Sequence, residues 1–274
     1  MAYKTQLSQE AIDTILDGYC NKHYGLIKTG KLVNVGPNIV RRILLEHKVH
    51  IRSFAEAASA NCVNRRQYNV NDDYFDQESP NMAYLLGFLA ADGTVRKDSN
   101  EIKIGLSSVD ADFLEMIRQE LQIEHPLFTY ETNNGYSVTE LKFTSSKIKR
   151  QLAKYNIVPN KTYTFDFPTT LSSKYYIDFI RGYFDGDGSI STAGTAIRFQ
   201  ICSFRPNVLE AIVNILYDIY GIPKVNIQRN MKESGNYLYT IQYSTTPTRQ
   251  IFNILYTPNS LYLSRKYEKY KSIV

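Results

Sequence analysis

The chain has 274 residues, of which 43% are hydrophobic, and a formal net charge of +5; this length suits two or three compact units. Its three cysteines, Cys20, Cys62 and Cys202, form no CxxC pair, which argues against a disulfide framework or a zinc ribbon. No apolar run approaches the roughly 18 residues of a membrane span, and the first residues lack the apolar core of a signal peptide. We therefore expect a cytoplasmic protein, of bacterial, phage or organellar origin, that contacts no membrane.

The positive charge is concentrated at the start of the chain. Residues 1–70 contain ten Lys and Arg and five Asp and Glu, whereas the rest of the chain contains 22 of each. A compact basic segment is the usual electrostatic signature of a module that binds a polyanion. An ordinary solvated surface would carry the same charge, so the interpretation depends on the helices of this segment.

Two amphipathic helices are predicted here, at 7–20 and 37–47, where apolar residues recur at helical spacing. A short element around 24–32 and a turn at 33–36 separate them, an order typical of a helix-turn-helix. A small helical bundle without a ligand has the same pattern, but the local charge favours a helix-turn-helix DNA-binding domain over residues 1–70. The polar face of the second helix carries the candidate DNA contacts Asn38, Arg41 and Arg42.

The segment after this domain is polar and acidic and ends in Pro80, which predicts a linker over residues 71–80. Beyond it the chain repeats itself. Tyr84–Gly93 reads YLLGFLAADG and Phe179–Gly188 reads FIRGYFDGDG, each an apolar helical stretch that ends in Asp-Gly.

The two copies are followed by the same order of predicted elements: strand, helix, two strands and helix. In the first strand of each copy, apolar and polar residues alternate, as in a sheet with one buried face. We therefore predict an α+β fold of two similar repeats, at residues 81–168 and 169–274, arranged as a pseudo-dimer within one chain. The elements are expected at 101–107, 110–121, 127–131, 137–144 and 145–155, and at 196–202, 206–220, 225–230, 237–244 and 247–256.

Small residues lie one helical turn apart in each copy: Gly87 with Ala91, and Gly182 with Gly186. Small faces allow two helix backbones to approach closely. If the two motif helices pack on each other, their C-terminal ends converge. The aspartates that end the two copies then lie side by side.

The converging aspartates are Asp92 and Asp187, next to the backbone carbonyls of Ala91 and Gly186. Two carboxylates and carbonyl oxygens form a hard oxygen site suited to Mg²⁺ or Mn²⁺, and helix C-termini also favour cations. Such a metal can activate water and stabilise the charge of a reacting phosphate. A single Asp-Gly is often only a helix stop, but its duplication favours a site.

The doubled motif resembles that of the LAGLIDADG family of homing endonucleases and RNA maturases. LLGFLAADG at 85–93 matches in the first copy and IRGYFDGDG at 180–188 in the second, and the resemblance covers about residues 81–274. It implies αββαββα repeats that form a β-sheet saddle on double-stranded DNA. It also implies a monomeric endonuclease that cuts both strands of a long, non-palindromic site with a divalent metal.

The resemblance also implies further site residues. Lys161 and Lys266 match the basic residue that follows the last helix of each repeat, near the scissile phosphates, and Gln200 matches a strand glutamine that organises active-site water. The first copy has Gly105 at the position of Gln200, so the half-sites are not equivalent. Ala90 replaces the aspartate that the second copy keeps as Asp185, a position with a structural role. Outward strand residues expected to contact DNA are Lys103, Lys142, Arg198, Gln200, Arg229 and Gln242.

Two alternatives remain open. An RNA maturase would help a group I intron to fold and would bind intron RNA. A DNA-binding regulator would have the same fold without catalysis. The presence of both Asp92 and Asp187 argues against the regulator.

Overall fold

A computed structural model describes residues 7–53, 56–57, 68–193, 196–233, 235–258 and 260–272. Cys62 and parts of the predicted 1–70 domain lie outside these ranges. The chain divides into two compact units, Met1–Gln67 and Tyr68–Val274. Within the described ranges, no helix is both long and apolar enough to cross a membrane.

The first unit is a small helical module. Ser8 caps its first helix by accepting a hydrogen bond from the Ala11 N–H, and Pro37 begins its last helix, where a missing N–H costs nothing. Ile15, Val40 and Leu44 are fully buried in its core. The helices are α1 (Gln9–Leu16), which continues as a π-helical turn (Asp17–Asn21), α2 (Leu26–Leu32) and α3 (Pro37–Glu46).

Residues 71–80 belong to the second unit, so the prediction of a linker there is wrong. A 3₁₀ turn at Tyr74–Asp76 buries Phe75. Lys147 donates hydrogen bonds to the carboxylates of Asp73 and Asp76. Polar residues that resemble a linker in the sequence therefore have hydrogen-bond partners on a helix more than 70 positions away.

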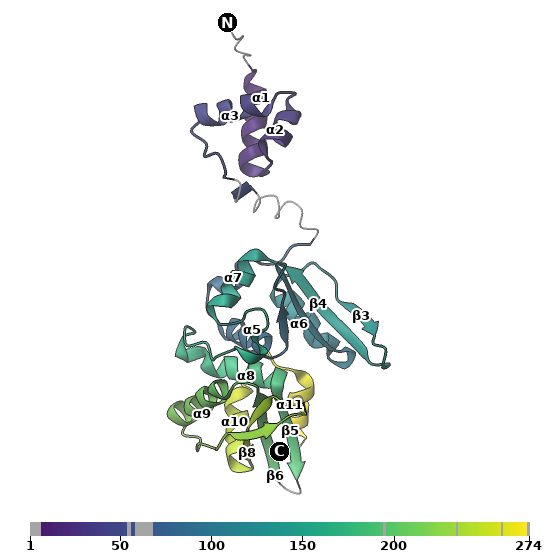
Figure 1. Cartoon of the computed structure of the whole chain (residues 1–274), viewed down its shortest axis with the longest axis vertical. Helices are drawn as coiled ribbons and strands as arrows, with labels where there is room; N and C mark the ends of the chain where they lie inside the picture. The colour runs from purple at the N-terminus through teal and green to yellow at the C-terminus, as the bar shows by residue number, and fades with distance from the viewer. Residues whose placement is uncertain are drawn as a thin grey trace. The chain divides into compact units, whose positions relative to one another are not determined.

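The second unit contains the two predicted repeats (Figure 1). Each has one antiparallel four-stranded sheet, with strand orders β1-β2-β4-β3 and β5-β6-β8-β7. The first repeat comprises α5 (Pro80–Ala91), β1 (Gly93–Val95), β2 (Glu101–Ser107), α6 (Ala111–Glu120), β3 (Phe128–Glu131), β4 (Ser137–Thr144) and α7 (Ser146–Lys154). The second comprises α8 (Tyr176–Asp187), β5 (Gly188–Ala193), β6 (Ala196–Ser203), α9 (Pro206–Tyr220), β7 (Gln228–Met231), β8 (Tyr237–Ser244), α10 (Thr246–Leu255) and α11 (Ser264–Lys271).

Both sheets bury one face and leave the other accessible. In β2 the side chains of Ile102 and Ile104 are fully buried, whereas Lys103 between them is not. The accessible face, here called the outer face, carries cross-strand pairs such as Lys103 with Lys142 and Gln200 with Gln242. The alternation of apolar and polar residues in these strands therefore predicts correctly which face of each sheet is buried.

Arg229 does not lie on the outer face, which corrects one sequence prediction. It pairs with Tyr239, on the same side of the sheet as the buried Ile241. Its guanidinium lies 3.4 Å from the ring centre of Tyr237. All four residues of β7 are exposed, so no apolar alternation reveals which side each residue faces.

The helices α5 and α8 pack side by side at the junction of the repeats (Figure 1). A Cβ atom on Gly182 would lie 2.8 Å from the backbone nitrogen of Phe88 and nearer still to the carbonyl oxygen of Tyr84. A Cβ on Gly87 would lie 2.7 Å from the nitrogen of Tyr183. Backbone therefore packs directly on backbone, as the paired glycines predict.

Two ion pairs of opposite polarity also join the repeats. Asp110, which precedes α6, binds Arg265 of the second repeat at 3.2 Å. Arg205, which precedes α9 in the equivalent position, binds Asp166 of the first repeat at 2.9 Å. Each pair attaches the segment that carries Lys161 or Lys266 to the opposite repeat.

Candidate metal centre and DNA-contacting residues

Asp92 and Asp187 lie where the two central helices end. Asp92 follows the last residue of α5, and its N–H donates to the Phe88 carbonyl at 2.9 Å. Asp187 is the last residue of α8. A Cβ atom on Gly186 would lie 3.4 Å from Oδ2 of Asp92. The sequence prediction that the helix ends converge here therefore holds.

The surroundings of both carboxylates disfavour their charge. Both residues are open to solvent, yet packing around the carboxylates removes part of their hydration. For Asp187, burial and then the charge of Asp92 raise the pKa to about 6, against the opposing charges of Lys161 and Lys266. Burial also raises the pKa of Asp92, and nearby cations oppose it. This is the electrostatic state expected of two acids that share one site.

The donor set fits a hard divalent cation. Within the described ranges, nothing donates a hydrogen bond to the Asp92 carboxylate, so its oxygens are available as ligands. No third His, Cys, Asp or Glu joins the pair among those residues. A cation here would therefore depend on two carboxylates, backbone carbonyls and water, which is the type of oxygen set that Mg²⁺ and Mn²⁺ accept.

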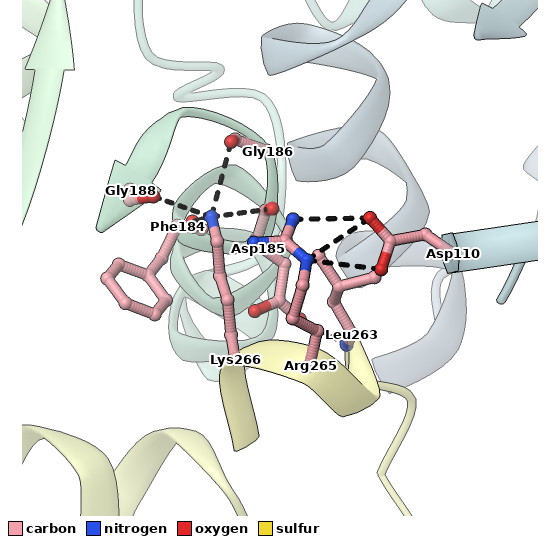
Figure 2. Close-up of polar contacts among 8 residues, drawn as sticks. All are labelled: Asp110, Phe184, Asp185, Gly186, Gly188, Leu263, Arg265 and Lys266. Atoms are coloured by element: carbon pink, nitrogen blue, oxygen red, sulfur yellow. Dashed lines mark hydrogen bonds and ion pairs between the residues drawn. The ribbon is translucent and has the colours of Figure 1, made fainter. Parts of the chain in front are cut away.

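Lys266 projects from α11 onto the end of α8 (Figure 2). Its Nζ donates to the carbonyls of Phe184 at 2.6 Å, Asp185 at 2.7 Å and Gly188 at 2.6 Å, and lies 3.2 Å from that of Gly186. An ammonium has three N–H groups, so four oxygens share them. Burial lowers the pKa of Lys266 to about 8, against the Asp185 charge, which opposes this effect. Its charge complements the negative helix end.

Lys161 occupies the equivalent place in the first repeat. Its Nζ donates to the carbonyl of Gly93, the counterpart of Gly188. Lys161 is buried, and burial lowers its pKa, while Asp187 and Asp92 act in the opposite direction. The two lysines are therefore related by the pseudo-symmetry, but Lys266 engages a larger set of carbonyls.

Asp185 anchors the segment that leads to Lys266. It is buried and accepts hydrogen bonds from the hydroxyls of Tyr84 at 2.8 Å and Tyr256 at 2.9 Å, and from the N–H of Leu263 at 2.8 Å. Burial raises its pKa. Tyr84 comes from α5, so this network crosses between the repeats. The first repeat has Ala90 at this position and lacks the carboxylate.

Gln200 lies on the outer face of β6. The register makes Lys103 its counterpart in the first repeat, because Lys103 pairs with Thr94 as Gln200 pairs with Ser189; the prediction that Gly105 occupies this position is therefore wrong. Its Nε2 lies 3.5 Å from Sγ of Cys202. A cavity of about 140 Å³ beside Asp187 is lined partly by Lys161, Tyr183 and Cys202. It has room for several water molecules next to a carboxylate, and Gln200 is two strand positions from the cavity wall.

The other candidate DNA contacts differ in availability. Asn38 and Arg41 are exposed on α3, whereas Arg42 lies 3.7 Å from Glu46. Lys103 forms an ion pair with Glu140 at 2.7 Å. Lys142 and Arg198 are partly exposed on the outer faces.

Comparison with known proteins assigns the fold to a family. Residues 79–156 and 174–255 match the LAGLIDADG-like domain family. The chain therefore belongs to this family, and its two matched segments are the two repeats described above.

The similar proteins are distant. An uncharacterized protein of Methanocaldococcus jannaschii, MJ0314, is 26% identical over 212 residues, which cover 73% of this chain and 74% of the relative. The DNA-directed RNA polymerase subunit Rpo1C of the same organism is 26% identical over 160 residues, 56% of this chain but only 17% of the subunit.

Two solved structures are also similar to this chain, at low sequence identity. The N-terminal LAGLIDADG domain of DUF199/WhiA is 16% identical, with 82% of this chain and 98% of that chain covered and a TM-score of 0.44. Meganuclease I-SmaMI, bound to uncleavable DNA, is 13% identical, with coverages of 71% and 88% and a TM-score of 0.46.

Proposed function

We propose that the chain is a site-specific homing endonuclease that hydrolyses both strands of a long, non-palindromic DNA site with a divalent metal. The observation that carries this proposal is the pair Asp92 and Asp187 at apposed helix ends. Their mutual charge favours binding of a cation, and Asp92 has no hydrogen-bond donor among the described residues.

The residues of the centre take distinct roles. Asp92 and Asp187, with the carbonyls of Ala91 and Gly186, would hold Mg²⁺ or Mn²⁺. When bound, the cation supplies Lewis acidity toward the phosphate and lowers the pKa of water. The cavity beside Asp187 has room for water next to this acid, and Gln200, two strand positions from the cavity wall, would orient it.

The lysines fix the ends of the two helices. Lys266 uses its N–H groups on carbonyls of α8 and β5, and Lys161 on the first residue of β1. Both therefore position the aspartates and add positive charge where the phosphodiester reacts. With a pKa of about 8, Lys266 is still mainly protonated at neutral pH.

DNA binding is assigned to the outer faces of the two sheets and to α3 in the first unit. The outer faces carry Lys103, Lys142, Arg198 and Gln242, and α3 presents Asn38 and Arg41. We assign the first unit to a helix-turn-helix domain, which lengthens the bound site. One chain already contains both repeats, so the protein acts as a monomer.

A second candidate is a DNA-binding protein without cleavage. Lys266 favours it because its Nζ lies 3.2 Å from the Gly186 carbonyl, an oxygen that the metal would also use. A lysine that permanently satisfies this oxygen would leave the acid pair with fewer ligands.

The test replaces each acid with its isosteric amide. In Asp92→Asn and Asp187→Asn, cleavage of a selected DNA site in Mg²⁺ should fall by orders of magnitude, whereas affinity for the site should stay within a few-fold. Asp218→Asn, an exposed position of α9, is the matched control. If either site variant cleaves like the wild type, that carboxylate is not a ligand. If the wild type binds but never cleaves, the second candidate is correct.

A further inference from the structure

An acidic side chain lies on the face that the proposed function presents to DNA. Glu140, in the middle of β4, pairs across the sheet with Gly105 and with Phe128. Gly105 has no side chain, so Glu140 is not covered from that side. A carboxylate that faces a polyanion is unfavourable unless cations or hydrogen-bond donors compensate its charge, and a base edge can supply such a donor.

The carboxylate is held rigidly with one oxygen free. Lys103 Nζ at 2.7 Å and the Tyr130 hydroxyl at 2.9 Å both donate to Oε1. Among the described residues, nothing donates to Oε2. Burial alone would raise the pKa of Glu140, but these hydrogen bonds outweigh it and hold the pKa below its ordinary value. Glu140 is therefore an ionised, fixed hydrogen-bond acceptor.

We propose that Glu140 is a specificity-determining residue that reads the N4 amino group of a cytosine in the half-site bound by the first repeat. This inference rests on the proposed function, since it requires the outer face to lie in the major groove. There the only base donors are the amino groups of cytosine and adenine. Adenine places its N7 acceptor beside the amino group, where it repels a carboxylate, whereas cytosine does not.

The second repeat reads its half-site by a different rule. The sheet position equivalent to Glu140 is Thr240, which pairs with Cys202 and Gln228 as Glu140 pairs with Gly105 and Phe128. The threonine hydroxyl both donates and accepts, so it tolerates more than one base, whereas the Glu140 carboxylate only accepts. The rings of Phe128 and Tyr130 stack with their centres 5.8 Å apart and line the approach to Glu140. This aromatic pair belongs to the first repeat only. The two half-sites therefore require different sequences.

Selection of DNA sites tests this proposal. Full-length protein is incubated with a randomised DNA library in EDTA, so that no DNA is cut, and the bound sequences are read. The wild type should prefer cytosine at one position of one half-site by roughly ten- to a hundred-fold. Glu140→Gln, which keeps the size of the side chain but replaces one acceptor oxygen by a donor, should lose this preference and keep the rest of the site.

Two further variants make the result specific. Tyr130→Phe keeps the ring but removes one donor to Oε1, so it should weaken the same preference without abolishing it. Glu101→Gln changes an acid on the same face that pairs with Arg96, and should leave the preference intact. A cytosine preference that survives in Glu140→Gln, or a wild-type site without one, overturns this inference alone. A wild type that selects no site overturns the proposed function as well.

Discussion

The close packing of α5 on α8 makes Gly182→Ala a sharp test of the architecture. The added Cβ would lie 2.8 Å from Phe88 N and closer to the Tyr84 carbonyl, whereas ordinary contact begins near 3.4 Å. Both obstacles are backbone atoms, which cannot rotate away. The helices must separate by more than roughly half an ångström, which disturbs an interface that includes the fully buried Leu85 and Phe179.

The magnitude follows from two opposing effects. Overpacking of this kind costs about 3 kcal/mol, and the better helix propensity of alanine returns about 1 kcal/mol. We therefore expect a net loss of about 2 kcal/mol in the free energy of unfolding. This loss corresponds to a melting temperature lower by roughly 4–8 °C for a unit of this size.

Urea denaturation followed by circular dichroism measures this loss. The midpoint should fall while the slope stays constant. Gly105→Ala is the matched control, because its Cβ would meet no atom closer than 3.7 Å, and it should change stability by less than about 0.5 kcal/mol. An unchanged midpoint in Gly182→Ala, or an equal loss in the control, would refute the packing of backbone on backbone.

Three further predictions concern the site and the first unit. Because the pKa of Asp187 is raised to about 6, the cleavage rate should increase as the pH rises through about 6. In EDTA, the contribution of this group to the free energy of unfolding should decrease as the pH rises from about 4 to 6, since the folded protein binds the extra proton. A cleavage rate that is flat from pH 5 to 7 would contradict this prediction. Replacing Lys161 or Lys266 with Met should slow single-turnover cleavage more than it weakens binding, because each lysine holds a helix end; a loss of affinity alone would make them phosphate contacts. Deleting residues 1–67, the whole first unit, should shorten the DNA footprint and flatten the salt dependence of binding; an identical footprint would assign the unit to another partner.

Much of the fold can be predicted from local patterns. The strands at 101–107, 137–144 and 237–244 have the predicted bounds, because apolar and polar residues alternate along them. The helix at 206–220 also has its predicted bounds, with a proline at its first position and Gly221 in the left-handed region after it.

The sequence predictions are wrong where contacts between distant residues determine the structure. Residues 71–80 have the composition of a linker, and contacts with distant residues, such as those of Lys147, together with the burial of Phe75, make them part of the second unit. The sequence predicts the wrong face for Arg229 because β7 has no buried residue that would show which of its side chains face the core.

In the candidate site, too, some features can be predicted from the sequence and others cannot. The paired glycines and Asp-Gly ends predict the convergence of Asp92 and Asp187, since both follow from helical spacing. The network of Asp185 with Tyr84 and Tyr256, and the ion pair of Arg265 with Asp110, join residues 71 to 155 positions apart. No local pattern specifies such contacts, although Asp185 within the repeated motif was a signal of its importance.

Cleavage of a supercoiled plasmid tests the central claim most directly. The plasmid carries one copy of the site selected by the wild-type protein, and a gel shift on the same site establishes full occupancy. In Mg²⁺ we expect linear DNA, the product of a break in both strands, and none in EDTA or with Asp187→Asn. Plasmid that stays supercoiled at full occupancy in Mg²⁺ and in Mn²⁺ would contradict it and leave a DNA-binding protein without nuclease activity.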